Sequence, residues 1–281
     1  MRNIEQKEYN LCGLIDMHIH SAPDVSPRIA DDIELTQQAK EAGMRAILLK
    51  SHITLTADRA FIAEKVVGGV RVFGGLALNY AIGGLNPTAV EMGIKMGAKE
   101  IWMPTRSAAH VLREKENSEG INILDQEGKL RPEICEIIEL IRQVNVILAT
   151  GHLSPQESFT LVQTAKSQGL RKIIITHPEA HFIRMPLEMQ RELTGDGVFF
   201  ERCFVDTTPL MNETVTIAEI ADHIRQIGVN STVLSTDFGQ VENPSPVEGM
   251  RAYLSALLVE GFTEKELRQM VGDNPAYLLD L

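Results

Sequence analysis

The chain has 281 residues, of which 44% are hydrophobic and 23% charged, and its formal net charge is −11. This composition is ordinary for a globular protein, and the length is close to the roughly 250 residues of one (β/α)8 barrel. The acidic balance argues against nucleic acid and anionic membranes, because both select a concentrated basic surface. We therefore expect a small-molecule substrate, with neither nucleic acid nor membrane as a partner.

The N-terminus and the cysteines give a prediction of location. The first ten residues, MRNIEQKEYN, lack the basic and apolar regions of a secretory signal. No apolar stretch approaches the roughly 18 residues of a membrane span. Cys12, Cys135 and Cys203 are far apart and form no CxxC pair, which is typical of reduced, mostly buried thiols. We expect a cytoplasmic protein, with Cys12 in the core at the start of the first strand.

Eight short apolar runs alternate with segments of helical periodicity. They are residues 12–19, 45–50, 70–78, 99–103, 145–149, 171–176, 198–205 and 231–236. A strand about every 25 to 35 residues is typical of βα units. Several runs are almost continuously apolar, as in parallel strands buried on both faces. The sequence therefore predicts an α/β fold, a (β/α)8 TIM barrel that residues 1–281 form as a single domain.

Helix signals lie between the predicted strands. Ser154 and Glu157 form a capping box, and Thr263 and Glu266 form a second one that begins an extra C-terminal helix. After Pro132, isoleucines recur at helical spacing and give that helix one apolar face: Ile134, Ile137, Ile138 and Ile141. We expect these helices to pack around the sheet.

Residues 105–131, after the fourth predicted strand, interrupt the repeat. They contain a polar segment of helical character over 106–116 and then a hairpin that turns at Glu127 and Gly128. A long loop after a barrel strand lies at the mouth of the barrel. We therefore expect a cap-like insertion that covers the mouth or contacts a second copy in a homo-oligomer.

Residues of metal-binding type stand at predicted strand ends. They are His18 and His20 after the first strand, Lys50 after the second, His152 after the fifth, His177 after the sixth and Asp237 after the eighth. His18 and His20 are two apart, so both side chains lie on one face of their strand. Barrels of this kind place their chemistry at the carboxyl ends of the strands.

This set of side chains predicts a metal centre. Neutral imidazoles and a carboxylate suit a divalent ion, zinc first, with manganese or iron as alternatives. One histidine at a strand end is usually hydrogen-bonded without a metal, and an isolated HxH pair is a weak signal. Here the pair coincides with two further strand-end histidines and an aspartate, which favours a metal. We expect one or two ions.

Two motifs resemble a known group of proteins. The sequence D-M-H-I-H at 16–20, followed in order by His152, His177 and Asp237, resembles the amidohydrolase superfamily of metal-dependent barrel hydrolases. The sequence V-G-D-N-P-A-Y-L-L at 271–279 is similar to the G-N-P-A-x-L-L ending common in that superfamily. The resemblance runs from about residue 12 to the C-terminus. It indicates the superfamily but not the reaction, and it places the chain in an uncharacterised branch.

The resemblance implies roles for these residues. His18 and His20 would bind the more buried ion together with Asp237. His152 and His177 would bind a second ion, or His177 would contact the reacting group if only one ion is present. Asp237 would also accept the proton of the attacking water. Asp237 and His177 are therefore the first catalytic candidates, and Lys50 is a third.

The sequence departs from the superfamily pattern after the fourth predicted strand. Binuclear members usually supply a carboxylated lysine or a glutamate there as a bridge, whereas this strand ends in Trp-Met-Pro-Thr. Lys50 is the only lysine at a predicted strand end, and it could act as a carboxylated bridging ligand from an unusual position. It could equally be a cation that pairs with Asp237 or binds substrate. A centre with a single ion stays open.

Loop residues supply candidates for substrate binding. Arg28 could bind a substrate carboxylate or phosphate with Asp24 beside it, although a salt bridge between the two is the favoured alternative. His52 could face the pocket or lie in a surface loop. Arg106, at the start of the insertion, is a weaker candidate.

Glu179 and His181 follow His177 closely in the sequence. A metal-binding histidine usually donates its other N–H to an acceptor, so both residues are candidates to orient His177. For His181, exposure to solvent is the favoured interpretation.

The leading functional prediction is a metal-dependent hydrolase that acts on an amide, ester, lactone or phosphoester bond of a small polar molecule. A decarboxylase or hydratase with one metal ion is the first alternative, because it fits the missing bridge. A phosphoesterase of the polymerase-and-histidinol-phosphatase type is weaker, because such proteins usually carry a late D-x-H where this chain has Asp237-Phe238-Gly239. A non-catalytic metal-binding barrel is the alternative outside enzymes, and the retention of Asp237 argues against it.

Overall fold

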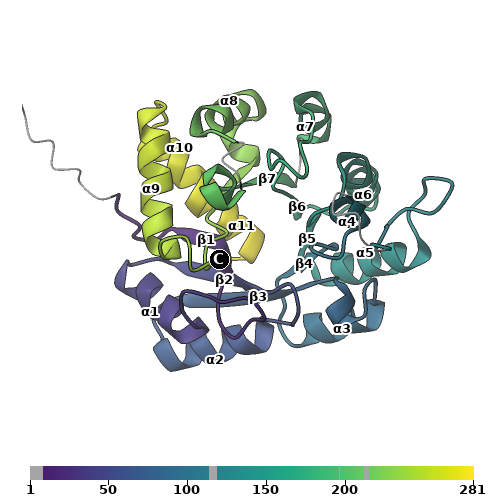
Figure 1. Cartoon of the computed structure of the whole chain (residues 1–281), viewed down its shortest axis with the longest axis horizontal. Helices are drawn as coiled ribbons and strands as arrows, with labels where there is room; N and C mark the ends of the chain where they lie inside the picture. The colour runs from purple at the N-terminus through teal and green to yellow at the C-terminus, as the bar shows by residue number, and fades with distance from the viewer. Residues whose placement is uncertain (1–8, 114–118, 196, 212–214) are drawn as a thin grey trace, which may run out of the picture.

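The computed structural model describes residues 9–113, 119–195, 197–211 and 215–281 (Figure 1). Eight parallel strands pair in sequence order within these ranges. They are β1 (Ile15–His20), β2 (Ala46–Lys50), β3 (Arg71–Ala77), β4 (Glu100–Trp102), β5 (Ile147–Ala149), β6 (Ile173–Thr176), β7 (Val198–Cys203) and β8 (Thr232–Ser235). Each overlaps one of the eight predicted apolar runs.

The chain at β1 and after β8 closes the sheet into a barrel. The backbone N–H of Asp237 donates to the carbonyl of His18 at 2.8 Å. The buried carboxylate of Asp16 adds a side-chain link, because it accepts hydrogen bonds from the N–H and the hydroxyl of Thr236. The predicted (β/α)8 fold is confirmed.

Helices cover the outside of the barrel (Figure 1). They are α1 (Asp32–Glu41), α2 (Ala57–Val67), α3 (Pro87–Lys95), α4 (Ala109–Arg113), α5 (Pro132–Val144), α6 (Pro155–Ser167), α7 (Leu187–Leu193), α8 (Ile217–Ile227), α9 (Pro246–Val259), α10 (Glu264–Arg268) and α11 (Asn274–Leu279). The short helical segments are η1 (Tyr80–Ile82), η2 (Phe204–Thr207), η3 (Pro209–Met211), η4 (Val229–Ser231) and η5 (Gln269–Asp273). Both predicted capping boxes, at Ser154 and Thr263, are present. In the described ranges, no helix has the length and apolar composition needed to cross a membrane.

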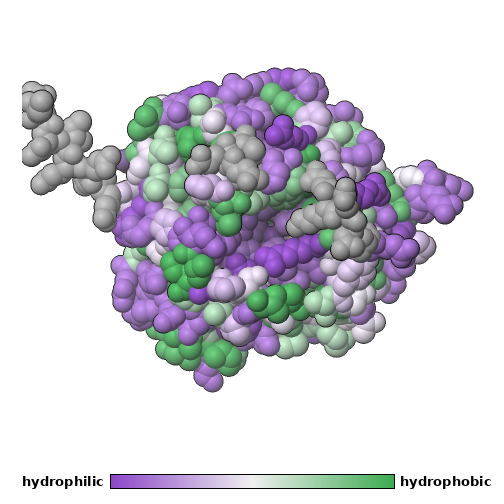
Figure 2. All heavy atoms as spheres, viewed as in Figure 1, coloured by the Kyte–Doolittle hydropathy of each residue, from purple (hydrophilic) through white to green (hydrophobic). Residues whose placement is uncertain are grey.

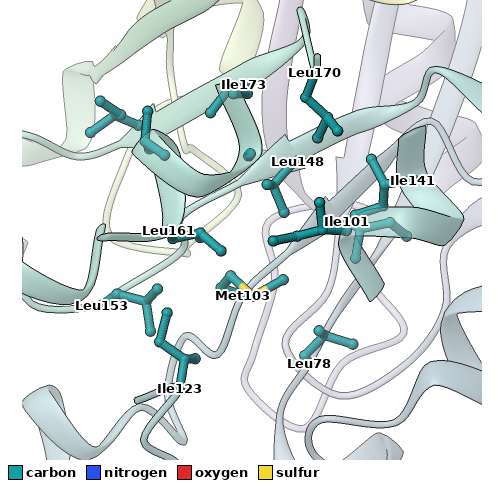
Figure 3. Close-up of a cluster of buried hydrophobic side chains, with 14 of the residues drawn as sticks. Leu78, Ile101, Met103, Ile123, Ile141, Leu148, Leu153, Leu161, Leu170 and Ile173 are labelled. Atoms are coloured by element: carbon teal, nitrogen blue, oxygen red, sulfur yellow. The ribbon is translucent and has the colours of Figure 1, made fainter. Parts of the chain in front are cut away.

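Apolar side chains fill the layer between the outer face of the barrel and its helices. Figure 3 shows part of this layer, where Ile101 of β4 and Leu148 of β5 lie near Ile141 of α5 and Leu161 of α6. The four isoleucines predicted for one face of α5 are all buried. This burial stabilises the strands, so the loops at their carboxyl ends start from fixed positions.

The C-terminal helix α11 closes the end of the barrel where the strands begin. Its Ala276, Leu278 and Leu279 belong to one buried cluster with side chains from the strands, among them Ile15, Ala46, Phe73, Ile147 and Val233. Asp280, directly after the helix, forms ion pairs with Lys99 and Lys172. This end of the barrel is therefore a packed apolar core.

The predicted insertion after β4 contains the expected elements. The predicted helix over 106–116 corresponds to α4, which begins three residues later than predicted. Residues 114–116 of that prediction lie outside the described residues, and so do residues 1–8 at the N-terminus. The hairpin is present, with an antiparallel bridge between Leu124 and Leu130 and a hydrogen bond from Asp125 N to Lys129 O.

The prediction that Cys12 lies in the core is wrong. β1 begins only at Ile15, and Cys12 is exposed in the turn before it. Cys135 is also exposed, whereas Cys203 is buried. All three thiols are free.

Candidate metal centre

A cavity of about 470 Å³ opens at the carboxyl ends of the strands. Figure 2 shows this hollow near the centre of the face, with hydrophilic residues inside it. The lining includes His20, Arg28, His52, His152, His177 and Asp237 among the predicted site residues, together with Arg106 and Val111 of the insertion. The volume lies in the range of small-molecule sites.

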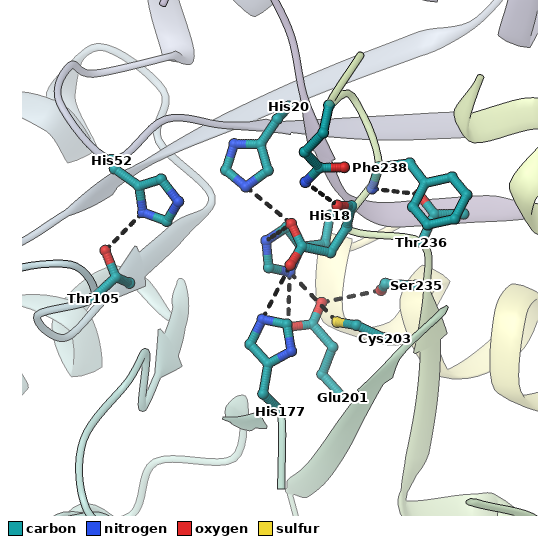
Figure 4. Close-up of polar contacts among 12 residues, drawn as sticks. His18, His20, His52, Thr105, His177, Glu201, Cys203, Ser235, Thr236 and Phe238 are labelled. Atoms are coloured by element: carbon teal, nitrogen blue, oxygen red, sulfur yellow. Dashed lines mark hydrogen bonds and ion pairs between the residues drawn. The ribbon is translucent and has the colours of Figure 1, made fainter. Parts of the chain in front are cut away.

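Three imidazoles converge on one carboxylate beneath this cavity (Figure 4). The Nε2 atoms of His20, His18 and His177 lie 2.9, 3.1 and 3.2 Å from the nearest Asp237 oxygen. His18 and His20 belong to β1, whereas His177 and Asp237 follow β6 and β8. All four residues are buried. The structure thus brings together four of the six predicted metal-binding residues.

Backbone geometry after β6 and β8 brings two of these residues to the centre. His177 and Asp237 both have a φ of 53°, in the left-handed region, so the chain turns sharply as it leaves each strand. Gly239, with a φ of 135°, lies against the carbonyl of His20, and a Cβ atom there would overlap it. Glycine therefore allows the loop after β8 to approach β1 closely enough to place Asp237.

Two buried carboxylates hold the other ring nitrogens. Glu201 of β7 lies 3.2 Å from His18 Nδ1, and Asp206 of η2 lies 3.0 Å from His177 Nδ1. An ionised carboxylate can only accept a hydrogen bond, so each Nδ1 carries the proton and donates. In the neutral tautomer this leaves both Nε2 lone pairs free on the side of Asp237.

The pKa shifts reflect this crowding of carboxylates and imidazoles. Burial alone would raise the pKa of Asp237, but His18 and His177 outweigh it and hold it well below its ordinary value. Burial opposes the charge of His177, yet Asp206 and Asp237 raise its pKa to about 10. Burial lowers the pKa of His20 to about 4, against the effect of Asp237. Asp237 is therefore ionised at neutral pH, and it needs a positive partner.

The donor set fits a divalent cation. His18 Nε2 and Asp237 Oδ1 are buried 3.1 Å apart, yet within the described residues neither makes a hydrogen bond, despite the close contact of His20 Nε2 with the same oxygen. Buried polar atoms are rarely left without a hydrogen bond. A cation held by the imidazole nitrogens and the carboxylate would satisfy both atoms and let the histidines stay neutral, since these are ordinary ligands of zinc, manganese and iron. His18, His20, His177 and Asp237 are the residues that would hold it.

Cys203, the last residue of β7, belongs to the same centre. Among the described residues, His18, His177, Cys203 and Asp237 each offer one donor atom, and these atoms lie within 4.8 Å of one another. The Cys203 sulfur lies 3.7 Å from His18 Nδ1, the nitrogen that faces Glu201. Burial raises the pKa of this thiol well above its ordinary value. Cys203 is therefore a fifth possible donor, on the Glu201 side of His18.

Lys50 lies inside the barrel but does not line the cavity. Its ammonium group has no hydrogen-bond partner among the residues that the structure describes, and it lies 5.1 Å from the centre of the Trp102 ring. Burial and the neighbouring Glu201 raise the pKa of Glu100 well above its ordinary value, and Lys50 opposes that shift. Lys50 thus faces glutamates within the barrel, and it forms no ion pair with Asp237. A bridging role for Lys50 stays a prediction.

His152 and His52 line the cavity beside the cluster. The His152 ring centre lies 5.6 Å from that of His177, and burial holds the pKa of His152 well below its ordinary value. His52 Nδ1 is hydrogen-bonded to Thr105 Oγ1 at 2.8 Å. Asn79 Nδ2 already donates to that oxygen, so the Thr105 hydroxyl is free to donate to His52. This arrangement favours the tautomer in which His52 Nε2 carries the proton.

Arg28 and Asp24 form the salt bridge that the sequence favoured. Arg28 Nε and Nη2 both donate to Asp24 Oδ2, at 3.0 and 2.8 Å, and both side chains are almost fully enclosed. Arg106, by contrast, makes one long hydrogen bond of 3.4 Å to Ser26 Oγ and no ion pair within the described residues. The weaker sequence candidate therefore has the more available guanidinium.

Glu179 does not orient His177, so that prediction is wrong. Its carboxylate instead pairs with the buried Arg202 and with His223. Asp206 takes the place beside His177 Nδ1. His181 is half-buried and lines the cavity, so it is not simply a solvent-exposed residue.

Sequence reasoning missed Glu201, Cys203 and Asp206, which all lie in the run VFFERCFVD at 198–206. One signal was available, because a charged residue within an apolar strand is rare unless it has a partner. Glu201 fits that description. Asp206 carried no such signal, since its position depends on the short helical turn η2 after the strand.

Comparison with known proteins places the chain in a family. The sequence profile of the family of unknown function DUF6282 matches residues 13–201. The chain belongs to this family. No curated protein matches it in sequence.

Several solved structures resemble the DUF6282 chain along almost its whole length. An amidohydrolase from Pseudomonas aeruginosa has a TM-score of 0.64 at 14% identity, covering 95% of each chain. A mutant organophosphorus hydrolase from Deinococcus radiodurans has a TM-score of 0.61 at 15% identity, covering 96% of this chain and 94% of that one. A candidate 2-pyrone-4,6-dicarboxylic acid hydrolase from Pseudomonas putida has a TM-score of 0.61 at 14% identity, covering 97% and 98%. At such identities the likeness concerns the fold, and it confirms the predicted resemblance to amidohydrolase barrels at that level.

Proposed function

We propose that this protein is a metal-dependent hydrolase of a small molecule, with one divalent ion held by His18, His20, His177 and Asp237. The observation that carries the proposal is the convergence of three Nε2 atoms within 3.2 Å of the Asp237 carboxylate. Two of these imidazoles are fixed through Nδ1 by buried carboxylates, as metal-binding histidines usually are. Zinc is the first expectation, with manganese or iron as alternatives.

The protein side chains would divide the chemistry among them. When bound, a divalent ion supplies Lewis acidity and brings the pKa of water to about 7. Asp237 is ionised, so it can hold the ion and accept a proton from the attacking water. His52 can donate its Nε2 proton to a substrate oxygen, because Thr105 occupies its other nitrogen.

The names of similar structures give further support to this proposal. The structurally similar proteins from Pseudomonas aeruginosa and Deinococcus radiodurans are named as an amidohydrolase and an organophosphorus hydrolase. The bond that this protein cleaves, whether ester, lactone, amide or phosphoester, is left to the loops that shape the cavity. The free thiols are compatible with the proposed cytoplasmic location.

Elemental analysis of untagged protein tests the metal centre. Wild type is expected to hold about one ion per chain after reconstitution with Zn²⁺, Mn²⁺ or Fe²⁺. His18→Ala should lose the ion, whereas the control His223→Ala should keep it, because His223 pairs with Glu179 away from the cluster. Two ions that fall to one in Lys50→Ala would restore the bridged binuclear alternative. Absence of metal in wild type would overturn the proposal.

An activity panel tests the hydrolysis. Metal-loaded wild type should cleave at least one class among esters, lactones, amides and phosphoesters. His20→Ala should abolish that activity, and His223→Ala should retain it. A folded, metal-loaded protein that is silent on every class would favour the decarboxylase or hydratase alternative, or binding without catalysis.

A further inference from the structure

The cavity above the metal centre is lined by both cationic and apolar side chains. The loops after β1 and β4 contribute Ser26, Arg28 and Arg106. Apolar side chains come from other loops, with Phe182 after β6 and Val205 and Leu210 after β7. A ligand that fills this space therefore meets cationic groups as well as an aromatic and aliphatic surface.

Of the two guanidinium groups, one is already paired. Arg28 donates two hydrogen bonds to Asp24 inside an enclosed pair, so its charge is neutralised within the protein. Within the described residues Arg106 has no such partner, and its one hydrogen bond is long. Burial and the nearby Arg28 lower the pKa of Arg106 against the charges of Asp24 and Asp237, and a guanidinium stays protonated at neutral pH. Arg106 is thus an exposed cation on the cavity lining with donors to spare.

The chemistry of a single free guanidinium selects the ligand. Its planar fork matches the two oxygens of a carboxylate, with two parallel hydrogen bonds. The fork also matches phosphate, but one guanidinium balances only one of the two charges of a phosphate dianion, because Arg28 is paired with Asp24. Of the nearby carboxylates, Asp24 is paired with Arg28, Asp237 lies among the imidazoles, and the exposed Glu242 forms no ion pair with Arg106 in the described residues. The site therefore fits a monoanion better than a dianion.

We propose that the substrate is a small apolar molecule that carries one carboxylate, which Arg106 binds while the reactive bond lies at the cluster of His18, His20, His177 and Asp237. This inference rests on the proposed function for the position of the reactive bond. The carboxylate contact itself is independent of catalysis, so binding tests it separately from turnover.

Calorimetric titration of metal-loaded protein with three probes tests the contact. The probes are phenylacetate, its neutral amide phenylacetamide and phenylphosphonate. Wild type should bind phenylacetate at least tenfold more tightly than the amide. Arg106→Gln should weaken phenylacetate binding by about ten- to a hundred-fold, as expected for a charge-assisted pair, with little effect on the amide. Arg106→Lys should fall between, because it keeps the charge but loses the fork.

A matched control is Arg113→Gln, which removes an exposed arginine of the same insertion that hydrogen-bonds Asn122 and does not line the cavity. It should bind phenylacetate as wild type does. The metal-depleted protein should retain the Arg106 dependence, which separates this contact from direct binding of the carboxylate to the metal.

Other outcomes overturn the inference. Phenylacetate binding that requires metal but ignores Arg106→Gln would place the carboxylate at the metal centre. Equal losses for phenylacetate and phenylacetamide would make Arg106 a structural residue, and tighter binding of phenylphosphonate would favour a dianion. Failure of wild type to bind phenylacetate at millimolar concentration also counts against it. A protein that binds phenylacetate through Arg106 yet hydrolyses nothing would instead contradict only the proposed function.

Discussion

The two ends of the barrel differ in the kind of side chain that they bury. Where the strands begin, Leu278 and Leu279 of α11 belong to a buried cluster of mostly aliphatic and aromatic side chains. Where the strands end, three imidazoles crowd around one carboxylate, and within the described residues His18 Nε2 and Asp237 Oδ1 make no hydrogen bond. The first end buries apolar groups, whereas the second concentrates buried polar groups.

The two ends of the barrel should therefore contribute differently to the free energy of unfolding and to metal binding. Apolar burial at the first end stabilises the fold. Desolvated, partly unpartnered polar groups at the second end cost stability unless a ligand satisfies them. Substitutions at the first end should mainly lower stability, whereas substitutions at the second end should mainly weaken metal binding. Three experiments test that expectation, from the largest expected effect to the smallest.

Truncation of a buried side chain at the apolar end should destabilise the protein without changing the metal centre. Leu279→Ala is expected to lower the free energy of unfolding by about 2–5 kcal/mol, because Leu279 is buried and the cavity left behind cannot fully collapse. Denaturant titration measures the loss, with the more exposed Leu258→Ala of α9 as the control. Metal content per folded chain should not change. A Leu279→Ala variant that kept its stability but lost its metal would contradict the assignment of this end to stability alone.

Loss of the carboxylate that orients His177, at the polar end, should weaken metal binding with little effect on the stability of the metal-free protein. Asp206→Asn is expected to weaken metal affinity by about 10- to 100-fold, because the amide carries no charge and can turn its NH2 group toward His177 Nδ1, so the tautomer of the ring is no longer fixed. Competition with a chelator measures this change, and Asp222→Asn on α8 serves as the control. The metal-free variant should unfold close to where metal-free wild type does. Unchanged affinity would show that Asp206 does not support the centre.

Two acidic residues, one at each end, should differ in how they respond to acid. Hydrogen bonds from Arg28 and Ser26 hold the pKa of Asp24 below 3.8 against the effect of burial, and ion pairs with Lys172 and Lys99 lower that of Asp280 in the same way. A lowered pKa in the folded state means that the ionised form stabilises the fold. That contribution is present above the unfolded pKa and is lost as the pH falls through the folded value.

Asp24→Asn should therefore cost about 1–3 kcal/mol at pH 7, and the difference from wild type should shrink below pH 3.8. Asp280→Asn should cost under about 1 kcal/mol, because that side chain is half exposed and its ion pairs are screened by solvent. Denaturant titration between pH 7 and pH 3 measures both. A pH-independent gap for Asp24→Asn would show that packing, rather than charge, holds the loop.

The sequence predicted the fold because local signals and burial agree in this chain. Apolar runs such as IIIT at 173–176 are buried on both faces, and capping residues such as Ser154 mark the helices between them. The same regularity placed His18, His177 and Asp237 at one end of the barrel. In a parallel barrel all strand ends meet, so residues far apart in the sequence must come together there.

The features of the site that could not be predicted from the sequence depend on side-chain direction and loop geometry. Glu179 and Asp206 are both acidic and both close to a strand end, but the loop after β6 turns Glu179 toward Arg202. Which of two arginines is free, Arg28 or Arg106, depends on the pairing with Asp24. Cys12 is exposed because β1 begins later than its apolar pattern suggests. None of these outcomes follows from periodicity.

The left-handed backbone of His177 and Asp237 bears on what can replace them. Besides glycine, this region is entered most readily by Asn, Asp and His, so both turns restrict the residue types that fit without strain. Glycine would relieve the remaining strain at either turn but would remove a donor atom from the cluster. The two turns therefore favour short polar side chains at the very positions where the cluster needs its nitrogen and oxygen atoms.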